Sequence, residues 1–233
     1  YEFYEKDGIR KYGFHGTSHR YVSGRCIELL GGKAEGTKIV TCHLGNGSSI
    51  SAVKDGKCFD TTMGLTPLEG IIMGTRCGSI DPAIIPVIMK SHNLTPDEVD
   101  HLMNKKSGML GLAGTSDNRT IEQMSKDGDK KAQLVENMLC HQLTKYIGGF
   151  AAAMGGVDAI VFTGGIGENN PHYRSRVAEK IKFLGTEIDE EKNSIRGEEV
   201  EISVPGSKVK MFVIPTNEEL VIARDTLEIV NNL

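Results

Sequence analysis

The sequence predicts an α/β fold, and three features lead to this prediction. Residues 38–62 contain three short strand-like runs, separated by a glycine-rich turn and an Asp-Gly pair, which is typical of an antiparallel meander. The apolar run 157–162 leads directly into glycines, after which helical sequence begins. Residues 130–154 carry apolar side chains at helical spacing. Strands and helices are therefore mixed along one chain, as in α/β proteins.

The first part of the chain predicts a helix followed by the meander. Apolar side chains recur at helical spacing over 17–30, and Gly31-Gly32 ends this helix. The three predicted strands are 38–42, 48–53 and 58–62, with a first turn at 44–49 and a second at Asp55-Gly56. The glycine-rich residues 63–78 predict a long ordered loop, a kind of segment that often carries functional residues.

The remainder predicts a series of helices and two further strands. Asp81-Pro82 can open a helix that ends at His92, and Thr95-Pro96 can open another. The long helix 130–154 is expected to be buried. Strand 157–162 is followed by a helix from Pro171, and strand 209–214 by a final helix that begins near Glu218 and ends near residue 230. No repeat or linker interrupts the sequence, so residues 1–233 are expected to form one domain.

Composition narrows the functional classes. The 233 residues are 39% hydrophobic and 25% charged, with a formal net charge of −4, so a surface that neutralises nucleic-acid phosphates is not expected. No run of about 18 apolar residues is present, and the acidic start resembles no signal peptide, so we expect a cytoplasmic protein without a membrane anchor. The five scattered cysteines predict reduced packing residues. A first residue of Tyr1, not Met, suggests a part of a longer protein.

Three glycine-rich turns, at 44–49, 111–116 and 164–167, expose backbone N–H groups and suit the approach of a phosphate. Ordinary tight turns are the alternative for each of them. Neither standard nucleotide fingerprint is present, because Thr37 precedes Lys38 where a P-loop needs Gly, and residues 165–167 lack the third glycine of a dinucleotide motif. Phosphate binding would therefore use a different scaffold.

Several polar residues are candidates for chemistry, each with a simpler alternative. His15 and His19 are four apart, but no third zinc ligand accompanies them, so we expect His15 on a loop where it can donate to an anion. Arg76 could stabilise a transferring phosphoryl group or form a surface salt bridge. The segment 168–170 could contact a nucleotide or cap a helix, and Glu218 could hold a Mg²⁺ ion or favour the start of the last helix.

Taken together, the motifs closely resemble the acetate kinase family, within the superfamily of acetate and sugar kinases, heat-shock chaperones and actin. The matching stretches are YGFHGTSH at 12–19, HLGNGSS at 43–49, TMGLTPLEG at 62–70, MGTRCG at 73–78, FTGGIGEN at 162–169 and PTNEE at 215–219. The resemblance implies the carboxyl-terminal, ribonuclease-H-like domain of an actin-like ATPase fold, with a mixed sheet and helices on both faces. It also implies ATP or ADP and Mg²⁺ as cofactors, acetate as substrate, and a homodimer.

The resemblance assigns roles to particular residues. It implies His15 and Arg76 as stabilisers of the transition state, Phe14 and Pro67 as walls of the acetate pocket, and Glu218 as the Mg²⁺-associated carboxylate. The implied nucleotide-binding residues are His43, Leu44, Gly45, Asn46, Gly47, Asp117, Asn118, Arg119, Gly165, Ile166, Gly167, Glu168 and Asn169. The family's amino-terminal domain, with further catalytic residues, has no equivalent in this sequence, so the chain is expected to be inactive alone.

Three functional alternatives stay open. In the first alternative, the phosphoryl acceptor is propionate or butyrate and not acetate, because Phe14 and Pro67 form only part of the pocket wall and other residues outside this sequence would complete it. In the second alternative, the chain is a non-catalytic ATP-binding or assembly module of the same fold. The third alternative concerns the apolar face of helix 130–154, which forms either the dimer contact or ordinary core.

Overall fold

The computed structural model describes all residues from Tyr1 to Leu233, and the chain divides into two compact units. Unit 1 consists of residues 1–14, 45–49 and 62–143, and unit 2 of residues 15–44, 50–61 and 144–233. Neither unit is continuous in sequence. No helix is both long enough and apolar enough to cross a bilayer.

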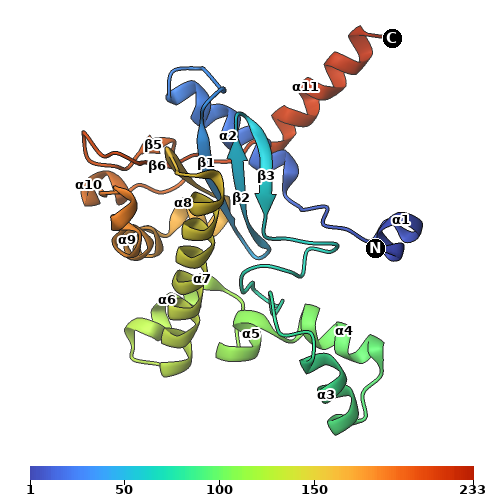
Figure 1. Ribbon diagram of the computed structural model, residues 1–233. Coiled ribbons are helices and arrows are strands. Elements are labelled where there is room, and N and C mark those ends of the chain that lie inside the picture. The colour runs from blue at the N-terminus through green and yellow to red at the C-terminus, as the bar shows by residue number, and fades with distance from the viewer. The chain divides into compact units, whose positions relative to one another are not determined.

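Unit 2 contains a six-stranded mixed sheet of order β3-β2-β1-β4-β6-β5 (Figure 1). Strand β1 pairs parallel with β4, and β4 pairs parallel with β6, whereas β2–β3 and β5–β6 are antiparallel. The mixed sheet predicted from the sequence is confirmed. The strands are β1 (Lys38–Leu44), β2 (Ser48–Lys54), β3 (Lys57–Thr61), β4 (Ala159–Thr163), β5 (Val200–Glu201) and β6 (Lys210–Val213).

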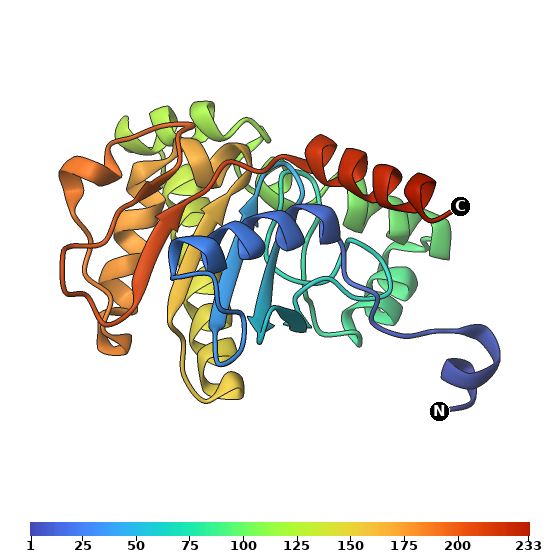
Figure 2. The same ribbon diagram turned by 90° about the horizontal axis from the view of Figure 1, so that it is seen from above.

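Helices cover both faces of this sheet, which explains why its central strands are apolar on both sides. Helix α2 (Gly16–Leu29) packs Val22 and Cys26 against Ile39 and Val161 on one face. Figure 2 shows the last turns of α7 (Lys130–Met154) on the opposite face. All five residues of β4 are buried. The other helices of this unit are α8 (Gly164–Asn169), α9 (Pro171–Lys180), η1 (Lys182–Leu184), α10 (Glu190–Asn193) and α11 (Glu218–Asn231).

The hairpin between β2 and β3 forms where the Asp-Gly pair predicts it. Asp55 has φ 53° and Gly56 has φ 74°, so both turn residues have the left-handed backbone that a type I′ turn requires. This turn geometry matches the twist of the two strands and sets their pairing.

Unit 1 is built from short helices and long ordered loops. Thr95 begins α4 with a capping box, because its hydroxyl accepts from Glu98 N and the Glu98 carboxylate accepts from Thr95 N. The helices that lie wholly in this unit are α1 (Glu2–Asp7), α3 (Ile84–His92), α4 (Pro96–Lys105), α5 (Gly108–Ala113) and α6 (Asn118–Lys126).

Two of the three glycine-rich segments predicted to be turns are helical in the structure. Residues 164–167 form the first part of α8, and Gly111 lies inside α5, which ends at Ala113 with Gly114 as its C-cap. Helix α3 begins at Ile84, later than Asp81-Pro82 suggests, although the Asp81 carboxylate does accept from Ala83 N in the turn before it. The helices at residues 17–30, 130–154 and from 218 onward are confirmed, with shifts of one residue at the ends of the first and last.

Candidate functional site

The parallel strands of unit 2 bring three candidate segments to one edge of the sheet. Because β1, β4 and β6 are parallel, their carboxyl ends lie on the same side. His43 and Leu44 end β1, α8 follows β4 without a gap, and residues 214–218 follow β6. In open α/β sheets, ligands bind outside the carboxyl ends of parallel strands. The topology thus gathers the candidates near residues 43, 165 and 218 at one edge of the sheet.

A cluster of three histidines lies at this edge. The rings of His15 and His43 are stacked, with centroids 4.1 Å apart, and His19 Nδ1 lies 2.7 Å from Thr41 Oγ1. Burial, then the charges of His43 and His15, lower the pKa of His19 to about 3. Burial, then His15, lower the pKa of His43 to about 4. His19 and His43 are therefore neutral at neutral pH.

His15 occupies the position before α2 that the sequence predicts. It is the N-cap residue, with a left-handed backbone of φ 56°, an uncommon conformation for a residue that is not glycine. Its side chain is half-buried, whereas His19 in the next turn is buried. The backbone therefore keeps the His15 ring near the surface, where a ligand can reach it.

Ser18 belongs to this cluster but is not among the residues expected from the sequence. Its hydroxyl is fully buried and lies 2.8 Å from His43 Nδ1, so it fixes the orientation of that ring. A signal was available, because Ser18 occupies the apolar stripe of α2 together with Val22 and Cys26. A polar residue on an apolar stripe indicates a buried hydrogen bond.

Helix α8 is tightly packed against β1. A Cβ atom on Gly164 would lie 2.8 Å from Leu44 O, so this position needs glycine. The Glu168 carboxylate accepts from Gly164 N at 2.8 Å and from Thr216 N at 3.3 Å, which joins α8 to the segment after β6. Gly165 is exposed, and a Cβ atom there would meet nothing within 4 Å. Of the glycines in α8, Gly165 is thus the one with open space before it.

The Glu218 side chain is suited to a metal ion that also has other ligands. Its carboxylate is half-buried in the first turn of α11 and forms no hydrogen bond or ion pair. No group of three or more His, Cys, Asp or Glu side chains could hold a metal ion by itself. Mg²⁺ commonly binds through one or two carboxylates together with substrate phosphates and water, so a single carboxylate fits this ion when it arrives with a nucleotide.

Asn46 and Arg76 lie on neighbouring loops of unit 1. Gly74 N donates to Asn46 O at 3.0 Å, and the Asn46 side chain fills the space that a Cβ atom on Gly74 would need. The Asn46 amide itself is exposed. Arg76 Nη1 contacts Pro67 O at 3.2 Å and Met73 Sδ at 3.6 Å, and the guanidinium forms no ion pair. The salt-bridge interpretation of Arg76 is therefore wrong, and its charge is available to an anion.

The other two candidate segments of unit 1 are positioned by backbone contacts. Gly13 N donates to Gly64 O at 3.3 Å, which fixes the half-buried Phe14 near the loop that carries Pro67. Asp117 is the N-cap of α6, because its carboxylate accepts from Arg119 N and Thr120 N. The side chain of Arg119 is 92% exposed and lies 3.2 Å from the Asp117 carboxylate. Capping alone explains Asp117, whereas Arg119 can still reach a ligand.

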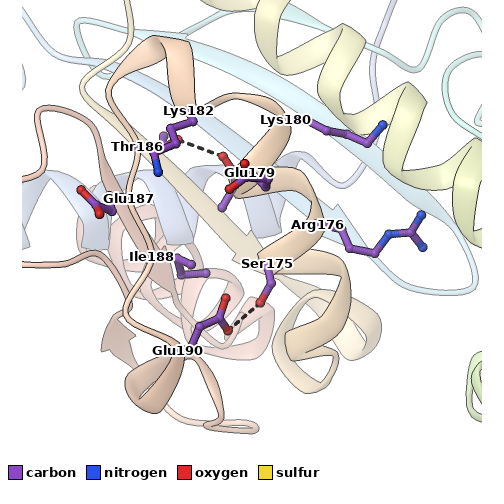
Figure 3. A pocket seen from close by; sticks show the side chains of 10 residues that line it. Ser175, Arg176, Glu179, Lys180, Lys182, Thr186, Glu187, Ile188 and Glu190 are labelled. Atoms are coloured by element: carbon purple, nitrogen blue, oxygen red, sulfur yellow. Dashed lines mark hydrogen bonds between the residues drawn. The ribbon is translucent and has the colours of Figure 1, made fainter.

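A sizeable cavity lies elsewhere in unit 2. It measures about 570 Å³ and is bordered by α9 and residues 186–190 (Figure 3). Charged side chains of both signs line it, including Arg176, Lys182 and Glu187, and none of them is a residue predicted to act. The cavity therefore adds nothing to the candidate site.

Comparison with known proteins adds independent information. A model of the acetokinase family matches residues 1–224. The chain is 58% identical to acetate kinase from Carboxydothermus hydrogenoformans over 232 residues, which are all of this chain and 58% of that protein. The chain thus spans somewhat more than half the length of this relative.

Solved structures agree on the fold. Acetate kinase from Porphyromonas gingivalis superposes with a TM-score of 0.95 at 48% identity, over 99% of this chain and 58% of that one. A propionate kinase from Francisella tularensis superposes with a TM-score of 0.89 at 43% identity, over 96% of this chain and 57% of that one. The fold expected from the motifs is confirmed, and the chain belongs to the acetokinase family.

Proposed function

We propose that the two units together form the carboxyl-terminal nucleotide-binding domain of a Mg²⁺-dependent acetate kinase, which moves the γ-phosphoryl group of ATP reversibly to acetate. The observation that carries this proposal is the convergence of His43, α8 and the segment before Glu218 at the carboxyl ends of three parallel strands. Family membership supports the reaction class. An amino-terminal domain completes the catalytic site in this proposal, so the chain alone binds nucleotide without turnover.

The chemistry needs positioning and charge, and no strong base. Acetate is already an anion near neutral pH, so it can attack without losing a proton. The obstacle is repulsion between acetate and the phosphates. Mg²⁺ beside Glu218 would supply positive charge to the phosphate oxygens.

The residues of this chain provide the remaining contacts in the proposal. Arg76 has no carboxylate partner, so its full charge can stabilise the equatorial oxygens of the transferring group. His15 donates a hydrogen bond to an anionic ligand in this proposal, and the exposed Asn46 region offers backbone N–H groups to phosphates. Gly165 gives the nucleotide close access to α8, and Arg119 is the candidate contact for the adenosine.

Calorimetric titration of the chain with MgATP tests nucleotide binding. We expect binding by the unaltered chain and its loss in Gly165→Asp, because the carboxylate would occupy the open space before Gly165 and repel the phosphates. Gly24→Asp is the matched control, since Gly24 is also an exposed helical glycine with nothing within 4 Å of a Cβ atom. A well-folded chain that binds no nucleotide would refute the proposal.

Propionate kinase is the second candidate, favoured by the Francisella tularensis structure. Because Phe14 and Pro67 form only part of the proposed acyl pocket, their identity does not fix the length of the acid. The comparison is of kcat/KM for acetate, propionate and butyrate in the longest protein that contains this chain. A preference for propionate or butyrate would replace acetate in the proposal.

A non-catalytic ATP-binding or assembly module is the candidate from another class. Such a module would change conformation with nucleotide but would not need a histidine and an arginine directed at the phosphoryl group. In the longest protein that contains this chain, His15→Ala and Arg76→Ala are expected to lower kcat by a factor of about 10² or more. Unchanged turnover in both variants would remove the roles proposed for these residues.

The proposed assembly is a homodimer. The apolar stripe of α7 is buried, with Val135, Leu139 and Ile147 at most 1% exposed, which favours the core interpretation of that helix. Helix α3 has no buried residue although most of its side chains are apolar, and Val87 is 63% exposed, so α3 is the proposed contact. Val87→Asp is expected to shift the sedimentation velocity from dimer to monomer, whereas Phe183→Asp, at an exposed site in unit 2, should leave it unchanged.

A further inference from the structure

Arg174 on α9 is a fully buried arginine with every N–H group satisfied. Its exposed fraction is 0%, which is unusual for a charged side chain. Its Nε donates to Asn193 Oδ1 at 2.8 Å, Nη1 to Gly167 O at 2.8 Å and Glu168 O at 3.0 Å, and Nη2 to Asn193 O at 2.6 Å and Ile195 O at 2.9 Å. These five bonds use the complete donor set of a guanidinium.

The acceptors of Arg174 are all uncharged. Four are backbone carbonyls and one is an amide oxygen, so no carboxylate neutralises the guanidinium directly. Burial, then the charge of Arg196, lower the pKa of Arg174 to about 10, so it stays protonated at neutral pH. The charge of Glu190 opposes this shift, but Glu190 is not among the acceptors, and burying a cation without a directly bound counter-ion is costly. A methionine here would leave these four carbonyls and the amide oxygen without their donor, so the arginine does more at this position than fill space.

The contacts of Arg174 concentrate on the last turn of α8. The final carbonyls of a helix have no partner within the helix, and Arg174 satisfies those of Gly167 and Glu168. Arg196 Nη1 donates to the next carbonyl, Asn169 O, at 2.7 Å, and Gly197 N donates to Glu168 O at 3.3 Å. Because Arg174 also binds Asn193, the last residue of α10, and Ile195, it joins α8 to the end of α10 and to the residues that follow. The end of α8 is thus fixed by Arg174 from the interior and by Arg196 and Gly197 at the surface.

We propose that Arg174 is a positioning residue for nucleotide binding, which holds the backbone of residues 165–169 in the conformation that receives the nucleotide. Arg174 is buried, so it does not touch the ligand and acts through α8. This inference rests on the proposed function, because it assumes that α8 contacts a nucleotide. It adds a residue outside the motifs that define the site.

The test compares MgATP affinity in Arg174→Lys with that of the unaltered chain. Lysine keeps the charge but has three donors and no planar fork, so it cannot hold the carbonyls of residues 167, 193 and 195 together. We expect the dissociation constant to rise about tenfold in protein that circular dichroism shows to be folded. Hydrogen exchange of the amides of residues 165–169 should also become faster. The control is Arg176→Lys, because Arg176 lies on the same helix and borders the cavity shown in Figure 3.

The outcomes separate this inference from the proposed function. If the unaltered chain does not bind MgATP, the proposed function fails and the inference fails with it. If the chain binds and folded Arg174→Lys binds equally well, with only a lower melting temperature, Arg174 is merely structural and the inference is overturned. Should Arg174→Lys not fold, Asn193→Ser removes the Nε acceptor and leaves the guanidinium in place. A several-fold loss of affinity in that variant supports the inference, and unchanged affinity overturns it.

Discussion

Replacing Gly164 by alanine should destabilise the protein strongly, because the position is constrained in two ways. Its φ of 77° is left-handed, which costs an alanine roughly 1–2 kcal/mol. The new Cβ atom would also lie 2.8 Å from Leu44 O and 3.1 Å from Leu44 C, and these backbone atoms cannot move without shifting β1. Overpacking of this kind costs about 1–3 kcal/mol. The expected loss in free energy of unfolding is therefore about 2–5 kcal/mol, a large share of the total stability of a domain.

The adjacent glycine provides the control for this prediction. At Gly165 the backbone is helical and a Cβ atom would meet nothing within 4 Å. Gly165→Ala should therefore stabilise the chain by roughly 0.5–1 kcal/mol, because alanine loses less backbone entropy in a helix. The same methyl group would stand before the proposed nucleotide, so MgATP binding should weaken although stability rises.

Urea unfolding followed by circular dichroism measures both variants, with stability taken from the midpoint and the slope. Opposite shifts of the midpoint are expected from two identical substitutions at neighbouring positions. A loss of less than about 1 kcal/mol in Gly164→Ala would show that β1 and α8 can separate at little cost, and the argument from close packing would be refuted.

Three further predictions concern other parts of the chain. Because folding lowers the pKa of His19 to about 3 and that of His43 to about 4, the unfolded state binds more protons below pH 6.5. The free energy of unfolding should thus fall as the pH is lowered from about 6.5 to about 4, with each histidine contributing up to about 1.4 kcal/mol per pH unit. The His19→Gln variant should therefore show a smaller slope in a plot of urea midpoint against pH. Thr95→Ala removes the hydroxyl of the capping box and should cost about 1 kcal/mol in urea unfolding, whereas no change would mean that α4 does not depend on its cap. Gly108 has a φ of 64°, and backbone carbonyl oxygens would lie 2.2 and 2.6 Å from a new Cβ atom, so Gly108→Ala should lower the free energy of unfolding by at least about 3 kcal/mol. The comparison is Gly114→Ala, where φ is 78° and the space is open, and where a loss of about 1–2 kcal/mol is expected.

Elements specified by neighbouring residues could be predicted from the sequence. The Asp55-Gly56 turn determines its hairpin through the backbone of two residues, and Thr95 with Glu98 determines the start of α4 through a capping box. Helix α7 is predictable because its apolar spacing continues for 25 residues. Each of these signals is local, so no knowledge of the tertiary structure was needed.

The two glycine-rich helices, α5 and α8, could not be predicted, because their glycines are needed for close packing against other backbone segments and the sequence does not show that packing. Gly164 and Gly108 allow close approach of another backbone segment, which leaves room for a short helix where the composition suggests a turn. The pairing of Ile39 with Ala159 is likewise invisible locally. Tertiary packing overrides propensity at these positions.

Candidate site residues that lie within the matched motifs could be named from the sequence, whereas the role of the residues that hold them in position could not. The motifs suggested His15, Arg76 and Glu218, and the structure adds that Arg76 and Glu218 have no charged partner. Ser18 and Arg174 act through hydrogen bonds to other parts of the fold, and a single sequence does not show the partners: the apolar stripe of α2 marks Ser18 as buried but does not point to His43.

The interleaved order of the two units has a consequence during synthesis on the ribosome. Strand β1 is complete at Leu44, yet its central neighbour β4 emerges only after more than a hundred further residues have been translated. Until then, one border of an apolar strand has no hydrogen-bonding partner and can join a strand of another nascent chain. Premature termination before Ala159 should consequently yield an insoluble product, and chaperone binding should be strongest over that interval.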